Sequence, residues 1–182
     1  MLVDSSDCTL LIVDVQEKLF SKIASFKTIN LYLLNALNVF SIMECPIIYT
    51  EQYPKGLGPT IKNLKQVLDS SKCKKLEKTS FSCFPFNKQK SIENFIQTTQ
   101  IIICGIETHI CILQTALDLK KYGYEVFIID ECVGSRTEIN KALGLQRLRQ
   151  NDIYILSFEM LVFELLRDSK NKHFKELSNF IK

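Results

Sequence analysis

The chain has 182 residues, of which 46% are hydrophobic and 24% are charged. This balance is typical of a globular protein, and the length predicts one domain over residues 1–182 with a core of its own. The formal net charge of +3 comes from dispersed Lys and Arg residues, which excludes the strongly basic class that binds nucleic acid. No apolar run is long enough to cross a bilayer, and we expect no membrane contact.

Seven cysteines, an odd number without regular spacing, do not form the pattern of a disulfide framework. Cys45 and Cys104 lie in or beside apolar runs, as buried thiols do. The start of the chain, residues 1–7, is short and acidic and does not have the pattern of a secretory leader. These features predict a reducing compartment and a cytoplasmic location.

Short apolar runs alternate with helical patterns along the chain. The runs predict buried strands at 9–13, 47–50, 101–104, 125–129 and 153–156. Helices are predicted at 28–43, 61–68, 91–98, 112–122, 138–150, 160–166 and 174–181, with Thr137 as the N-cap of the fifth. The alternation predicts an α/β fold, a three-layer α/β/α Rossmann-like domain with a mostly parallel sheet.

Two segments between these elements are interpreted as irregular. The long interval between the second and third strands leaves room for one extra strand or for an irregular crossover. Residues 72–78 in this interval are rich in Lys and are interpreted as a solvated surface. Residues 131–136 are interpreted as the loop that follows the fourth predicted strand.

Asp14 and Cys111 both follow buried strands. Asp14 ends the strand at 9–13, and Cys111 lies near the start of the helix after Gly105. Since the carboxyl ends of parallel strands meet at one edge of a sheet, these two side chains are expected to meet there. The helix dipole and the free N–H groups of the first helical turn favour a thiolate at Cys111.

Lys78 leads into an aromatic stretch, TSFSCF. A lysine in this position either pairs with a carboxylate or extends its ammonium to solvent, and the sequence leaves both possibilities open. If Lys78 reaches Asp14 and Cys111, the carboxylate can take the thiol proton and the ammonium can stabilise the resulting anions.

Five motifs resemble the isochorismatase-like cysteine hydrolase family. They are DVQ at 14–16, KTSFSCF at 78–84, GIETHIC at 105–111, EQYPKGLGPT at 51–60 and DECVGSR at 130–136. The last two are similar to the subgroup of isochorismatase domain-containing proteins. The motifs follow one another in the family's order and cover almost the whole chain.

The resemblance implies an Asp–Lys–Cys catalytic triad. Asp14 would be the general base, Lys78 its electrostatic partner and Cys111 the nucleophile that forms a covalent intermediate. The family also has a cis peptide bond before the cysteine, which corresponds to Ile106–Glu107. The amides of Glu107 and Cys111 would then form the oxyanion hole.

The chain departs from the nicotinamidases of this family at their metal site. Those enzymes use an aspartate and closely spaced histidines after the second strand, where this chain has TEQYPKGLGPT. His109 and His173 are its only histidines, so we expect no metal and no organic cofactor. A metal site formed by Cys104, His109 and Cys111 is disfavoured because Cys104 lies inside a core strand.

Four further side chains are candidate contacts for a small-molecule substrate: Gln16, Tyr53, Phe81 and His109. Each also has a simpler interpretation. Gln16 orients Asp14 or faces solvent, the two aromatic residues belong to the core, and His109 caps or orients the turn before Cys111.

The sequence predicts a hydrolase that acts on a small amide-like substrate. One alternative is hydrolysis of an isochorismate-type vinyl ether, which needs an acid but no thiol. The other is a non-catalytic or redox-sensing member of the family. The resemblance also implies a homo-oligomer, for which the apolar stretch 158–166 is a candidate interface, although packing within the chain explains that stretch equally well.

Overall fold

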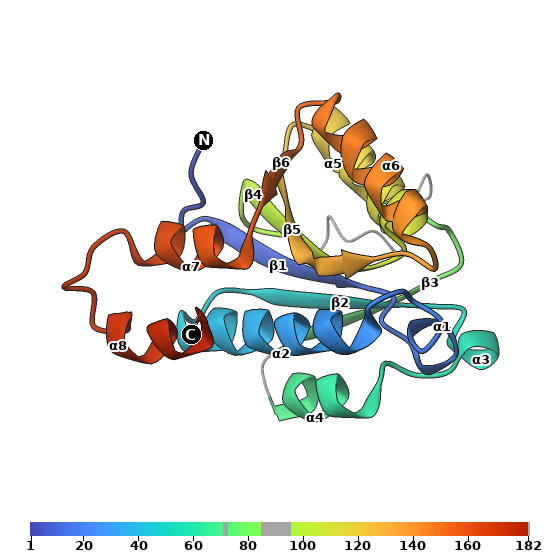
Figure 1. Cartoon of the computed structure of the whole chain (residues 1–182), viewed down its shortest axis with the longest axis horizontal. Helices are drawn as coiled ribbons and strands as arrows, with labels where there is room; N and C mark the ends of the chain where they lie inside the picture. The colour runs from blue at the N-terminus through green and yellow to red at the C-terminus, as the bar shows by residue number, and fades with distance from the viewer. Residues whose placement is uncertain (71–72, 85–95, 182) are drawn as a thin grey trace.

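Six parallel strands form one sheet at the centre of the molecule (Figure 1). The computed structural model describes residues 1–70, 73–84 and 96–181. The order across the sheet is β3-β2-β1-β4-β5-β6. The strands are β1 Cys8–Val13, β2 Ile47–Gln52, β3 Lys74–Lys78, β4 Gln100–Ile106, β5 Glu125–Gly134 and β6 Tyr154–Leu156. The fold is therefore the predicted α/β architecture with a parallel sheet.

Helices cover both faces of this sheet, with α2 and α4 on one side and α5 and α6 on the other (Figure 1). The helices are α1 Glu17–Phe20, α2 Phe26–Ile42, α3 Pro54–Leu57, α4 Lys62–Ser70, α5 Leu113–Lys121, α6 Glu138–Arg149, α7 Phe158–Leu166 and α8 Phe174–Leu177. A π-helical turn, η3 Thr108–Ile112, precedes α5, and a 3-10 turn, η4 Ser178–Ile181, follows α8. Within the described residues, no helix is long and apolar enough to cross a membrane.

The alternation of side chains along β1 explains the three layers. Leu10 and Ile12 point into the core that α2 and α7 cover, whereas Leu11 and Val13 point into the core beneath α5 and α6. Every residue of β1 is buried, as expected for a central strand of a parallel sheet. The continuous apolar run TLLIV is thus the sequence signature of a strand buried on both faces.

Most predicted elements are confirmed, with small shifts at their ends. Thr137 caps α6 as predicted, because its hydroxyl accepts a hydrogen bond from the amide of Asn140. The predicted helix at 91–98 falls for the most part outside the described residues.

The interpretation of residues 72–78 as a solvated surface was wrong. Residues 74–78 form β3, the extra strand for which the sequence left room, and β3 pairs in parallel with β2 at the edge of the sheet. Lys74, Lys75 and Glu77 are exposed, whereas Leu76 and Lys78 are buried. Charged residues are common on edge strands because they discourage pairing with other chains, and they mask the strand pattern in the sequence.

The interpretation of residues 131–136 as a loop was also wrong in part. The strand β5 continues through Gly134, with a register shift that places Gly105 opposite Val133 and Ile106 opposite Gly134. Residues 130–132 form the irregular segment of the strand, where Asp130 pairs with Lys141 and Glu131 accepts a hydrogen bond from the amide of Phe158. Polar residues at such a bulge look like a loop in the sequence.

The chain order places a topological switch point between β1 and β4. From β1 the chain proceeds to β2 on one side, whereas β4 and β5 lie on the other side. In open α/β sheets, ligands bind at the carboxyl ends of the strands next to such a point. Asp14 and Cys111 follow the two strands that flank it.

Gly105 allows β1 and β4 to approach closely at this point. It has φ +114°, and a Cβ atom on it would lie 2.1 Å from the carbonyl oxygen of Val13. Since β1 and β4 are both central strands, neither can move away without disturbing the sheet.

We predict that Gly105→Ala lowers the free energy of unfolding by roughly 3 kcal/mol or more, because its methyl group overlaps backbone atoms. Gly123→Ala is the matched control, since Gly123 also has a positive φ of +90° but no atom lies within 4 Å of the position that its methyl group would take. The control should lose only about 1 kcal/mol, the cost of the left-handed backbone. Urea denaturation of both variants measures the difference, and equal losses would contradict this account.

Candidate active site

Asp14 lies directly after β1 and is buried, with 1% of its surface exposed. Its backbone has a left-handed φ of 52°, a conformation that Asp tolerates better than most residues. Thr50, in the neighbouring strand β2, donates its hydroxyl to Asp14 Oδ1 at 2.7 Å. Asp14 also donates its own amide to the carbonyl of Thr50 at 3.2 Å. The end of β2 therefore fixes the orientation of this carboxylate.

Lys78 is the last residue of β3, and its ammonium is buried against Asp14 Oδ2 at 2.5 Å. The same nitrogen donates to the carbonyl oxygens of Ser80 and Phe81 at 3.1 and 3.0 Å. All three protons of the ammonium are therefore used. The choice that the sequence left open for Lys78 is decided in favour of the carboxylate.

The surroundings of Lys78 keep it charged. Burial alone acts to lower the pKa of its ammonium. The neighbouring Cys83, Asp14 and Cys111 groups act in the opposite direction, and the net pKa lies above its ordinary value. Lys78 therefore remains a cation over the physiological pH range and holds Asp14 as its ion-pair partner.

Cys111 lies in η3, after the end of β4, and is 5% exposed. Burial and the negative charge of Asp14 together raise the pKa of its thiol well above the ordinary value. Desolvation and the Asp14 carboxylate thus act against the thiolate that the helix start is expected to favour. The raised pKa keeps the thiol of Cys111 neutral next to this carboxylate.

The turn before Cys111 begins with a cis peptide bond between Ile106 and Glu107. The carbonyl of Glu107 accepts hydrogen bonds from the amides of Ile110 and Ile112, at 3.0 and 3.2 Å. The carboxylate of Glu107 binds the guanidinium and the backbone amide of Arg136. The role of the Glu107 and Cys111 amides as an oxyanion hole stays a prediction.

His109 lies on the same turn, and its Nδ1 is 3.0 Å from the hydroxyl of the buried Ser135. This contact joins η3 to the segment just after β5. It fits the interpretation of His109 as a residue that orients the turn.

The side chain of Gln16 is bound to the backbone at the end of β2 and in the loop that follows, and its contact with a substrate stays a prediction. The residue is fully buried. Nε2 donates to the carbonyls of Gln52 and Gly58, and Oε1 accepts from the amide of Gln52 at 2.8 Å. Gln16 thus fixes the end of β2.

Tyr53 and Phe81 belong to the loops after β2 and β3, with 56% and 54% of their surface exposed. Neither ring is a core residue. The amide of Tyr53 donates to the carbonyl of Lys78 at 2.8 Å, and the carbonyl of Phe81 binds the ammonium of Lys78. Both residues therefore start close to the site, and their contact with a substrate stays a prediction.

The sequence interpretation missed Gln52 and Cys83. The thiol of Cys111 donates to Gln52 Oε1 at 3.5 Å. Cys83 is fully buried beside Thr50 and Lys78, and burial raises the pKa of its thiol to about 11. Gln52 is the last residue of β2, in register with Lys78. Its position at a strand end was the signal that could have identified it.

At the end of β2, where no metal ligands were expected, the structure has an ion pair. Glu51 binds Lys75 at 2.7 Å, and its other oxygen accepts from the amide and the hydroxyl of Thr60. In the part of the chain that the structure describes, no three His, Cys, Asp or Glu side chains form a group that could hold a metal ion. The residues present after β2 therefore serve to anchor the loop 53–60.

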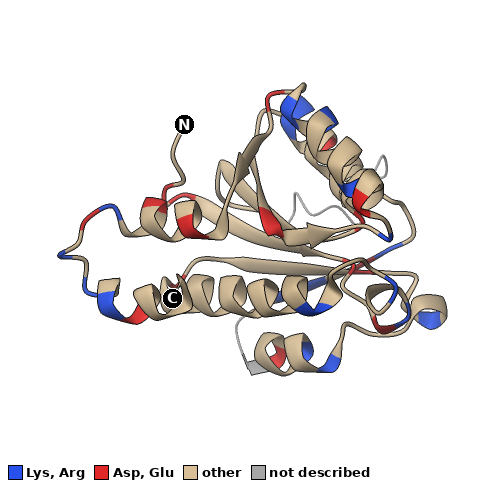
Figure 2. Cartoon of the chain, in the orientation of Figure 1, with Lys and Arg blue, Asp and Glu red and all other residues tan. Residues whose placement is uncertain are grey.

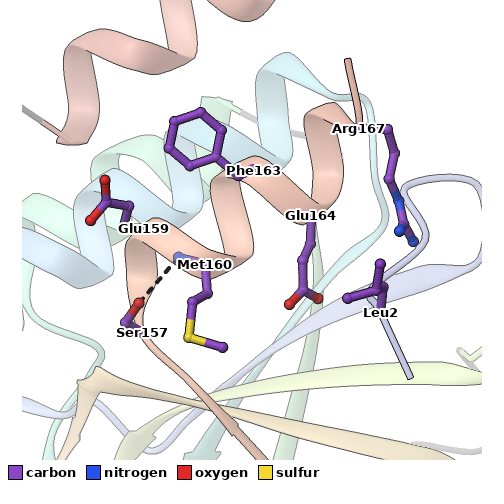
Figure 3. A pocket seen from close by; sticks show the side chains of 7 residues that line it. All are labelled: Leu2, Ser157, Glu159, Met160, Phe163, Glu164 and Arg167. Atoms are coloured by element: carbon purple, nitrogen blue, oxygen red, sulfur yellow. Dashed lines mark hydrogen bonds between the residues drawn. The ribbon is translucent and has the colours of Figure 1, made fainter. Parts of the chain in front are cut away.

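A surface pocket of about 490 Å³ lies away from this site, between α7 and the start of the chain (Figure 3). Met160 and Glu164 extend from one side of α7 and Phe163 from the other (Figure 3). The guanidinium of Arg167 donates a hydrogen bond to the carbonyl of Val3, and the carboxylate of Glu164 accepts one from the amide of Val3. No residue of the predicted triad lines this pocket, so it does not carry the chemistry of the triad.

We predict that the rate of Cys111 alkylation by iodoacetamide rises with pH around a midpoint above ~8.5, the value of a free thiol. Asp14→Asn should move the midpoint down, because it removes the negative charge that raises the thiol pKa. Lys78→Met should move it up, since the Lys78 charge lowers that pKa. Peptide mass spectrometry separates Cys111 from the other thiols, and circular dichroism checks that each variant is folded. A midpoint that is the same in all three proteins would contradict this electrostatic account.

Comparison with known proteins identifies a family for this chain and agrees with the fold. The isochorismatase domain family matches residues 8–160. Isochorismatase domain-containing protein 2A of Mus musculus is 36% identical over 173 residues, which cover 95% of this chain and 82% of the relative. Isochorismatase domain-containing protein 2 of Danio rerio is 37% identical over 172 residues, which cover 94% of this chain and 85% of the relative.

Solved structures extend the comparison. A structure of MAR1 ribonuclease from Caenorhabditis elegans has a TM-score of 0.91 and 30% identity, and the match covers 100% of this chain and 92% of that one. Nicotinamidase from Staphylococcus aureus has a TM-score of 0.72 at 16% identity, with 82% and 98% coverage, and shares the fold alone. The match over residues 8–160 and the 36% identity over most of a relative's length establish that the chain belongs to the isochorismatase-like hydrolase family.

Proposed function

We propose that this chain is a cysteine hydrolase that cleaves a carbon–nitrogen bond in a small amide-like substrate. Membership in a hydrolase family supports the reaction class. The observation that supports the catalytic residues is the buried ion pair of Lys78 and Asp14, which lies beside the thiol of Cys111. A base, its cation and a nucleophile from three separate elements meet at the edge of the sheet where ligands bind.

The proposed reaction has two steps. The sulfur of Cys111 attacks the carbonyl carbon while its proton passes to Asp14, and the C–N bond then breaks as the amine leaves with that proton. Water attacks the resulting thioester, Asp14 takes a proton from the water, and the thiol of Cys111 recovers it as the acid leaves. The sum is an amide plus water giving an acid plus an amine.

The protonation states of the free protein suit this sequence of steps. A neutral thiol beside an ionised base keeps the nucleophile unreactive until a substrate carbonyl is in place. The charge on Lys78 offsets the negative charge that moves between Asp14, the sulfur and the substrate oxygen. The amides of Glu107 and Cys111 are the proposed donors to that oxygen.

The proposed substrate is a small molecule, and the proposed reaction uses neither a metal nor an organic cofactor. Cys111 is 5% exposed and Asp14 is 1% exposed, so a reactive group must enter a narrow site. Lys and Arg are distributed over several helices and loops, with Asp and Glu among them (Figure 2). The net charge of +3 is correspondingly small for a protein that binds a polyanion.

A homo-oligomer is part of this proposal. The structure of YcaC from Escherichia coli, which shares the fold at 21% identity, is described as an octamer. In the stretch 158–166, Met160 and Phe163 are about half exposed, while Phe158, Leu161 and three further side chains pack inside this chain. This exposed pair lines the pocket of Figure 3 and is apolar surface of α7 that is available to another copy.

We predict that a library of small carboxamides contains a substrate from which the purified protein releases ammonia or an amine. Cys111→Ala and Asp14→Asn should each lower kcat/KM by about 10³-fold or more, because the two residues act together in the bond-breaking step. Cys73→Ser is the matched control, since Cys73 is a thiol outside the site, and it should keep the activity. Mass spectrometry after rapid quenching should show an acyl group on Cys111.

Three results would contradict this proposal. Full activity of Cys111→Ala toward an isochorismate-type vinyl ether would show that acid catalysis suffices. Cleavage of RNA that survives Cys111→Ala would point to a different activity and a different site. No turnover of any compound, with Cys111 alkylated like an exposed thiol, would favour a non-catalytic protein.

A further inference from the structure

The polar groups around Cys111 are almost all occupied by contacts within the protein. The ammonium of Lys78 donates its three protons to Asp14, Ser80 and Phe81. The two oxygens of Asp14 accept from Thr50 and Lys78. Neither residue therefore has a free proton with which to recognise a substrate.

Gln52 is different, because its side chain touches the nucleophile and is only loosely bound. Its Oε1 lies 3.5 Å from Cys111 Sγ, and its Nε2 makes a long hydrogen bond of 3.4 Å to the carbonyl of Thr79. The residue is partly exposed, whereas Asp14 and Lys78 are buried. The side chain of Gln52 is thus bound to the sulfur and more exposed than Asp14 or Lys78.

The backbone of Gln52 is held firmly even though its side chain is loosely bound. The side chain of Gln16 binds both the amide and the carbonyl of Gln52, in the manner of a neighbouring strand. The backbone of Tyr53, the next residue, is tied to Lys78. The amide of Gln52 is therefore presented from a fixed point, as substrate-positioning groups must be.

The reaction itself leaves the acceptor oxygen of Gln52 without a partner. In the free protein the thiol of Cys111 donates to Gln52 Oε1 at 3.5 Å. Once the proton has passed to Asp14, Oε1 faces an electron-rich sulfur and needs another donor. The N–H of a carboxamide whose carbonyl carbon approaches the sulfur is in reach of this oxygen, whereas an ester presents only oxygens there.

We propose that the side-chain amide of Gln52 binds the N–H group of the substrate's scissile carboxamide and thereby selects carboxamides over esters. This inference rests on the proposed function, and it names the substrate class: amides that keep at least one hydrogen on nitrogen. Gln52 Oε1 accepts a hydrogen bond from this N–H group, which replaces the thiol of Cys111 as the donor to that oxygen.

The test compares a carboxamide substrate with the methyl ester of the same acid in two variants. Gln52→Met keeps the length of the side chain but cannot accept a hydrogen bond from the substrate N–H group. The ratio of kcat/KM for the amide to kcat/KM for the ester should fall about 10- to 100-fold, the effect of one hydrogen bond at a partly exposed site. Gln146→Met, the same substitution at an exposed position of α6, is the matched control and should leave the ratio unchanged.

An equal loss for amide and ester in Gln52→Met would overturn the proposal, because a purely structural role lowers both. If the wild-type protein hydrolyses neither compound, the proposed function fails, and protection of Cys111 decides the role of Gln52 separately. Millimolar propionamide should then slow Cys111 alkylation in the wild-type protein more than N,N-dimethylpropionamide does, and Gln52→Met should abolish the difference. Equal protection by the two amides, or none, would overturn the role of Gln52.

Discussion

The buried contact between the Lys78 ammonium and the Asp14 carboxylate is the constraint on which the arrangement of the site depends. Removing two charges from water costs several kcal/mol for each ion, and their attraction offsets this only if every remaining polar atom is satisfied. Two carbonyls of the segment after β3 complete the shell of the ammonium, and the hydroxyl of Thr50 completes that of the carboxylate. The backbone conformation of residues 78–81 is thus needed to stabilise the ion pair.

This constraint also explains why the sulfur remains protonated. A carboxylate that is close enough to act as a base also repels a thiolate, and the charge of Lys78 offsets that repulsion only in part. The site therefore does not store a reactive anion. It holds a carboxylate of fixed orientation next to a thiol, and in the proposed reaction the approach of an electrophile moves the proton.

The parts of the structure that were predicted from the sequence are those with a strong local pattern. The runs TLLIV and QIIIC indicated central strands because both faces of such strands are apolar. Asp14 and Cys111 could be placed at one edge because they follow such strands directly. The family's motifs added Lys78, for which the local pattern gave two opposite interpretations.

The parts that were missed depend on contacts between distant residues. The alternating charges of 74–78 resemble a solvated face until β2 lies beside them, and the polar bulge of β5 resembles a loop until α6 and α7 satisfy it. The sequence also does not reveal that the side-chain amide of Gln16, close to Asp14 in the chain, binds the backbone of β2. The raised pKa of Cys111 needed the same long-range information, namely its burial and its distance from Asp14.

The position of β3 at the rim of the described sheet has a consequence for local dynamics. An outermost strand has one neighbour, so it opens in partial unfolding events that leave the central strands intact. Lys78, the cation of the site, is carried by this strand, whereas Asp14 and Cys111 are anchored to the central ones. Fraying of β3 would leave the carboxylate without its counter-ion while the rest of the core stays folded. Local opening of this one strand would therefore disassemble the ion pair without global unfolding.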